Sequence, residues 1–150
     1  MNKVPTKAFD ELETATAEHN ILGERLSLTF RDLLVKLSGE KRFVNIEGFQ
    51  IEIIMRYLNT ELLKSARNDE KIRLKLDEEL QKLAVENRSN LEYYSLIRCL
   101  RFLFVTQSDW ENVAQDSPIY YFLCHLSKIL RDVEPDFVDF FRADLFGEEN

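Results

Sequence analysis

Few side chains in this sequence are suited to acid–base, metal or nucleophilic chemistry. The 150 residues include two histidines, His19 and His125, and two cysteines, Cys99 and Cys124. No glutamate stands three residues before either histidine, as a di-iron helical bundle requires. The chain also lacks the H-E-x-x-H, paired C-x-x-C, phosphate-loop and G-x-S-x-G motifs. The sequence therefore predicts no catalytic residue, no metal site and no cofactor, and we expect that the protein is not an enzyme.

The cysteines and His125 fit structural roles instead. Cys99 and Cys124 each lie among Leu, Phe and Ile, which is typical of buried free thiols in a reducing compartment. His125 falls at the edge of the apolar stripe of its helix, where we expect a hydrogen-bonded boundary residue. Residues 1–20 contain acids and no apolar run, and no stretch approaches the length of about 18 uncharged apolar residues that spans a membrane. We expect a cytoplasmic protein without a membrane span.

Two arginines form the first candidate binding surface. Arg98 and Arg101 interrupt an otherwise apolar helix that we expect over residues 91–106, at the centre of the fold. They lie about 60° apart around the helix axis, and Tyr94 and Phe102 each stand four residues from Arg98. Arginine beside aromatic rings is common in protein interfaces and can also hold an anion. Because an unpaired buried guanidinium is costly, the alternative is that both arginines pair with acids of the C-terminal helices.

A stripe of basic residues is the second candidate surface, and it forms only if one helix continues through Asn68. Its members then lie within about 60° of one another and could follow a phosphate backbone. Acids between residues 70 and 79 fall beside the stripe, so each basic residue could instead be the exposed partner of an acid three or four residues away. The stripe consists of Lys64, Arg67, Lys71, Lys75 and Lys82.

The third candidate is an acidic and aromatic C-terminal segment, residues 132–150. Residues 109–150 contain three basic and ten acidic side chains, which accounts for the whole net charge of −7. A helix of this kind suits a hydrophobic groove rimmed by Lys and Arg on a protein partner. The alternative is that it folds onto its own domain, because each buried phenylalanine contributes roughly 1.5–3 kcal/mol. The residues predicted to contact a partner here are Asp136, Phe137, Asp139, Phe140 and Phe141.

The elements that position these side chains are predicted to be helices. Glycine and proline number only 4 and 3, fewer than the frequent turns of a β-sandwich or barrel need. Apolar residues recur at helical spacing throughout the chain, most clearly from Leu26 to Leu37. An apolar content of 45% and a charged content of 31% suit one folded domain over residues 1–150. We expect a compact all-α bundle of about seven to eight helices.

Capping residues and prolines predict where these helices begin. One segment, from about residue 46 to residue 86, is either a single long helix or two helices that meet at Asn68. A very long helix in a small domain often pairs with a second copy, so we expect a homodimer. Gly147 is predicted to end the last helix. The expected helix starts are Thr6, Asn45, Ser89 to Glu92, Ser108 to Glu111, Ser117-Pro118 and Pro135.

These features favour a non-enzymatic cytoplasmic interaction module that recruits or inhibits a protein partner with a basic surface. One alternative is a small helical subunit of a nucleic-acid-associated complex, which depends on the basic stripe. Another is a helical protein that binds a small apolar or anionic ligand near Arg98 and Arg101.

Overall fold

The computed structural model describes residues 10–12, 14–16, 23–104, 118–130 and 135–147, and all regular structure in these ranges is helical. The predicted all-α bundle is therefore confirmed. Short helical turns occupy residues 10–12 and 14–16. The longer elements are α2 (Gly23–Gly39), α3 (Ile51–Tyr57), α4 (Thr60–Asn68), α5 (Glu70–Glu86), α6 (Leu91–Arg101), the 3₁₀ turn η1 (Phe102–Phe104), α8 (Pro118–Leu130) and α9 (Pro135–Phe146).

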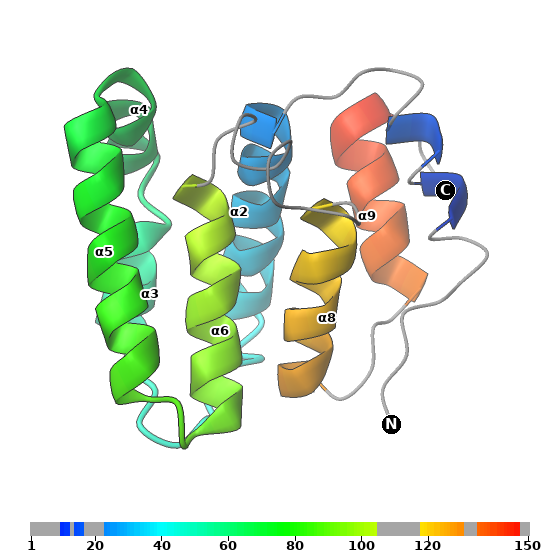
Figure 1. The fold of residues 1–150 in the computed structure, drawn as a ribbon. Coiled ribbons are helices and arrows are strands. Elements are labelled where there is room, and N and C mark those ends of the chain that lie inside the picture. The colour runs from blue at the N-terminus through cyan, green and yellow to red at the C-terminus, as the bar shows by residue number, and fades with distance from the viewer. Residues whose placement is uncertain (1–9, 13, 17–22, 105–117, 131–134, 148–150) are drawn as a thin grey trace.

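Helix α6 lies at the centre of the bundle, as its apolar surface predicts. It packs between α5 on one side and α8 on the other, and these three helices lie side by side in Figure 1. Helix α2 lies behind them and packs against η1, α8 and α9, while α4 folds back against α5. Six side chains of α6 are buried by these neighbours: Tyr93, Ser95, Leu96, Ile97, Cys99 and Leu100.

The core is organised around the phenyl ring of Phe30 in α2. This ring is completely buried and stacks on Phe122 of α8, with ring centroids 4.3 Å apart. It also meets Phe102 of η1 and Phe141 of α9 edge to face, at 6.3 Å and 5.9 Å. The apolar stripe predicted for α2 is buried along its whole length from Leu26 to Leu37. One aromatic cluster therefore joins α2 to three elements that come much later in the chain.

The single long helix considered for residues 46–86 is wrong, because the chain is interrupted at two places. At Asp69, the residue after the predicted junction at Asn68, the side chain caps α5 by accepting a 2.9 Å hydrogen bond from the backbone N–H of Lys71. A second interruption at Leu58 and Asn59 was not predicted. The Asn59 side chain caps α4 by accepting hydrogen bonds from two backbone N–H groups. These interruptions let α4 turn back onto α5, so residues 46–86 do not form the long helix from which the homodimer was expected, and the homodimer stays a prediction.

Other helix boundaries also differ from the prediction. Asn45 does not start a helix, since turns and loop occupy residues 40–50 and bury Ile46 before α3 begins at Ile51. Asn90 rather than Ser89 caps α6, accepting a hydrogen bond from the backbone N–H of Tyr93. The predicted starts of α8 and α9 at Pro118 and Pro135 are confirmed, and α9 ends before Gly147, whose φ is +70°. The predicted helix starts at Thr6 and Ser108 lie outside the described residues.

Replacing the central ring tests whether the aromatic cluster holds the fold together. We expect Phe30→Ala to lower the free energy of unfolding by about 3–5 kcal/mol, because a fully packed site cannot close around the lost ring. Urea denaturation followed by circular dichroism measures this. The matched control is Leu74→Ala on α5, where the leucine is 52% exposed and the change should stay within about 0.5 kcal/mol. Equal effects of the two substitutions would contradict this account of the core.

Candidate functional site

Arg101, one of the two arginines predicted for a binding surface, is used inside the domain. Its Nε and Nη2 atoms lie 3.0 Å and 3.3 Å from the two carboxylate oxygens of Asp77 in α5. The internal ion pair that the sequence allowed is therefore present, but its acid comes from α5 and not from the C-terminal helices. Phe102 is likewise buried, against Phe30 and Phe122. Neither the guanidinium of Arg101 nor the ring of Phe102 is therefore free to contact a partner.

Arg98 differs from Arg101 because no hydrogen bond or ion pair holds it within the described residues. It is half-buried in the last turn of α6, and Tyr94, one turn earlier, is half-buried against the core. Both side chains are therefore partly accessible to solvent. Of the four predicted residues on this helix, the structure leaves these two available for contact.

His125 in α8 does not have the hydrogen bond that we expected for it. Its ring packs 5.8 Å from the ring of Phe102, and its Nδ1 atom is buried without a hydrogen-bond partner in the described structure. Burial, followed by the positive charges of Lys128 and Arg98, lowers the pKa of His125 to about 4. The imidazole is therefore neutral at physiological pH.

The two cysteines are free thiols, as predicted. Cys99 is fully buried, and burial raises the pKa of its thiol, so that it stays protonated at neutral pH. Cys124 is half-buried on α8. In the described residues no group of three or more His, Cys, Asp or Glu side chains could hold a metal ion.

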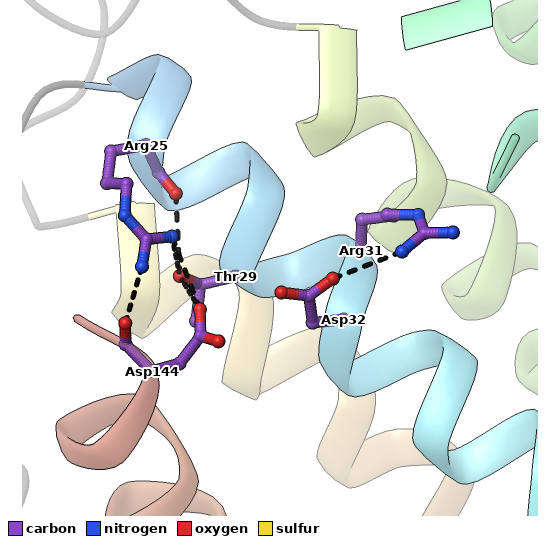
Figure 2. A network of polar contacts seen from close by, with 5 residues as sticks. All are labelled: Arg25, Thr29, Arg31, Asp32 and Asp144. Carbon is purple, nitrogen blue, oxygen red and sulfur yellow. Dashed lines mark hydrogen bonds and ion pairs between the residues drawn. The ribbon is translucent and has the colours of Figure 1, made fainter. Parts of the chain in front are cut away.

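The C-terminal helix α9 docks on its own domain, which was one of the two outcomes considered. Figure 2 shows the polar contacts that hold it against α2. The Asp144 carboxylate accepts a 2.6 Å hydrogen bond from the buried hydroxyl of Thr29 and lies 3.2 Å from Nη1 of Arg25. The Arg25 guanidinium also donates to the backbone oxygen of Asp144. Burial and the nearby Asp144 raise the pKa of Asp32, the next acid along this face of α2.

This docking determines which of the predicted partner-binding residues on α9 remain accessible to a partner. Phe137 and Phe141 are buried in the core, so a partner could reach them only if α9 left the domain. Phe140 and Asp139 are half-buried at the surface. The side chain of Asp136 lies outside the described part of the structure. The buried aromatic residues of this segment, Phe137 and Phe141, thus stabilise the core of their own domain.

The basic stripe does not form as one continuous helical surface. Its five residues are all exposed, but Lys64 and Arg67 belong to α4, whereas the others belong to α5 beyond the interruption at Asp69. Lys64 lies 3.7 Å from the carboxylate of Glu61, in the kind of local pair that was the alternative. The geometric condition for a phosphate-tracking stripe is therefore not met.

A surface that the sequence did not reveal lies at one end of the molecule, and we call it the end surface. Of the six large hydrophobic side chains that are exposed in the described residues, five come from two stretches of chain, 44–55 and 85–91. These stretches meet, since the Asn90 side chain donates a 2.8 Å hydrogen bond to the backbone oxygen of Glu47. Both run through the same end of the bundle in Figure 1. The end surface consists of Val44, Ile51, Met55, Val85 and Leu91.

A groove adjoins the end surface between α3 and α5. It has a volume of about 340 Å³. Apolar parts of Ile53, Tyr57 and Leu83 line it. Charged residues of both signs complete the lining: Arg56, Glu79, Lys82 and Glu86. The signal for this region in the sequence is weak. It consists of Ile51, Val85 and Leu91, single apolar residues outside the buried faces of their helices, and such residues are common on ordinary protein surfaces.

Comparison with known proteins yields no relative. No family model, curated protein or solved structure matches the chain. Within the described residues, none of the helices combines the length and the apolar character needed to cross a membrane.

Removing the Asp144 carboxylate tests the docking of α9. We expect Asp144→Ala to lower the free energy of unfolding by about 1–2 kcal/mol, because the buried Thr29 hydroxyl and Arg25 lose their acceptor. Amide hydrogen exchange in α9 should also accelerate. Asp139→Ala is the matched control, since Asp139 lies on the same helix and forms no ion pair within the described residues. Unchanged exchange in α9 of the Asp144 variant would show that these contacts do not hold the helix.

The neutral state of His125 predicts a pH dependence of stability. Its pKa is about 4 in the folded protein against an ordinary value of 6.5, so between these values the unfolded chain binds a proton that the folded chain does not. The free energy of unfolding should therefore fall as the pH is lowered from 6.5, by about 1–2 kcal/mol at pH 5. Denaturation at several pH values measures this fall. The variant His125→Gln should lose most of it, and an equal fall in both proteins would assign the effect to other groups.

Proposed function

We propose that the protein is a non-enzymatic, cytoplasmic interaction module that binds a protein partner through its end surface. The observation that carries this proposal is that five of the six exposed large hydrophobic side chains of the described structure come from two stretches of chain, which the hydrogen bond between Asn90 and Glu47 joins. Single exposed apolar residues are ordinary, but a cluster at one place is typical of binding sites. The acidic C-terminal helix that the sequence suggested as the binding element is less suitable, because its aromatic residues belong to the core.

The partner that fits this end of the molecule presents apolar side chains together with basic ones. Three of the apolar residues, Ile51, Val85 and Leu91, are each followed directly by a glutamate. Those glutamates form no ion pair in the part of the chain that the structure describes: Glu52, Glu86 and Glu92. Lysine or arginine on a partner would complement them, and charges at the rim of an interface mainly speed association and select the partner.

The groove between α3 and α5 gives such a partner a place for an anchoring side chain. Hot spots of protein interfaces are apolar or aromatic side chains that enter a pocket and exclude water. Ile53, Tyr57 and Leu83 supply an apolar lining, and Arg56 is held beside it by a 3.0 Å ion pair with Glu79. We infer that an amphipathic helix or a short segment of the partner inserts one apolar residue here.

Polar substitutions on the end surface test this function without disturbing the core. The triple variant Met55→Gln, Val85→Gln and Leu91→Gln changes residues that are 44%, 55% and 57% exposed, so it should remain folded. Tagged wild-type and variant proteins are used to isolate partners from source-cell lysate after nuclease treatment, and the dissociation constant of the partner obtained is then measured by calorimetry. We expect the variant to bind the same partner at least about tenfold more weakly.

The matched control is Leu74→Gln, which removes the sixth exposed hydrophobic residue. Leu74 lies on α5 about 16 Å along the helix from Val85, outside the end surface. Its substitution should leave binding unchanged. A partner that binds the triple variant as tightly as the wild type would overturn the assignment of this surface, and loss of all partners on nuclease treatment would favour the nucleic-acid-associated alternative.

Neutralising the glutamates tests the chemistry of the partner separately. We expect Glu52→Gln, Glu86→Gln and Glu92→Gln together to weaken binding by a few fold and to reduce its dependence on salt, because rim charges are screened over about 10 Å at 0.1 M salt. Unchanged salt dependence would contradict a basic partner while leaving the apolar contact intact.

A further inference from the structure

We propose that Arg98 and Lys128, together with the imidazole of His125, form a binding site for a small oxyanion on the outer side of the contact between α6 and α8. The site is distinct from the end surface and does not depend on the function proposed above. Its ligand class is a phosphate group or a carboxylate carried by a small molecule, since both present negatively charged oxygens to a guanidinium and an ammonium group.

The packing of α6 against α8 brings the three side chains together. The two helices run in opposite directions, as the colours of Figure 1 show, and the rings of Phe102 and His125 lie 5.8 Å apart where they meet. Arg98 stands one turn before Phe102 on α6. Lys128 stands nearly one turn after His125 on α8. In an antiparallel pair these two steps lead in the same direction, so the two cations come level with each other beside the histidine.

Arg98 is unusual among the arginines of this protein. Seven arginines are half-buried in the described residues, and six of them lie within 4.0 Å of a carboxylate oxygen: Arg25, Arg31, Arg42, Arg73, Arg101 and Arg142. Arg98 is the seventh and has no such partner there. Because a partly desolvated guanidinium without a counterion is costly, its position suggests that an anion from outside completes the site.

The surroundings of His125 support an electropositive site. Its buried Nδ1 atom has no hydrogen-bond partner in the described structure, although buried polar atoms are generally paired. Lys128 and Arg98 both act on His125 and on the thiol of Cys99, and no carboxylate is among the groups that do so. The charged groups that act on the ring are thus two cations, and the aromatic ring of Phe102 packs beside it. A bound oxyanion would weaken the positive potential at this histidine and so favour its protonated form.

The geometry suits one anionic group better than an extended polyanion. A guanidinium can donate two parallel hydrogen bonds to one phosphate or carboxylate, while an ammonium group acts as a point charge on a flexible stem. Arg98 is half-buried, so the contact would be partly shielded from water, and Lys128 is exposed and free to move onto the ligand. The neighbouring Arg101 already forms an ion pair with Asp77. The positive charges that remain for a ligand at this site are those of Arg98 and Lys128.

The experiment follows the imidazole signals of the full chain by nuclear magnetic resonance. There are only two histidines, so comparison with His125→Gln assigns the signal of His125. The pKa of His125 is measured in sodium phosphate, in sodium trifluoroacetate, whose carboxyl group stays ionised throughout this titration, and in sodium chloride of equal ionic strength. We expect a saturable change that raises the pKa of His125 by about one unit in phosphate or trifluoroacetate but not in chloride. A response to phosphate alone assigns a phosphate ligand, and a response to trifluoroacetate as well assigns the wider oxyanion class.

Substitution of the cations decides whether the response comes from this site. Lys128→Gln changes an exposed side chain and should weaken phosphate binding about tenfold, and Arg98→Lys, which retains the charge but loses the forked donors, should weaken it by a smaller factor. Lys75→Gln on α5, also exposed, is the matched control and should change nothing. Equal responses to phosphate and chloride, or a phosphate response that survives in Lys128→Gln with unchanged affinity, would overturn the proposal.

Discussion

The packing of Phe30 is the contact on which the rest of the structure depends. Its ring joins α2 to η1, α8 and α9, three elements that the chain reaches only after 70 residues or more. Because aromatic rings bury large areas and prefer specific stacked and edge-to-face arrangements, this cluster fixes how the helices sit as well as whether they associate. The positions of α6 and α8, and with them Arg98 and His125, follow from it.

The acidic C-terminal part of the chain takes on a different meaning once it is folded. Asp144 binds Arg25 and Thr29 of α2, and Arg142 of the same helix lies 3.0 Å from the carboxylate of Glu11. Part of the acidic charge that the sequence suggested for a basic partner is thus paired within the domain, where it attaches α9. The same principle accounts for Arg101 and Asp77, since half-buried charges are stable in a protein when each finds its counterion.

Sequence patterns predicted the helical class and the inner faces of individual helices well. The stripe from Leu26 to Leu37 is buried, and the prolines at 118 and 135 begin α8 and α9. These features are local, because apolar spacing and capping act within a few turns of one helix. The interruption at Leu58 and Asn59 escaped prediction because the helical pattern continues through it. The local feature that marks it is Asn59, whose side chain caps α4 by accepting hydrogen bonds from two backbone N–H groups.

The sequence by itself therefore determined that this protein is a helical bundle, that α6 is central and that Arg98 and Arg101 interrupt its apolar surface. Only the tertiary structure decided that Arg101 pairs with Asp77 while Arg98 has no acid within the described residues, and that the two stretches with five exposed apolar side chains meet. The physical reason is that ion pairing and surface clustering depend on distances between residues far apart in the chain. Helical periodicity gives the direction of a side chain on its own helix, but not the neighbour that it meets.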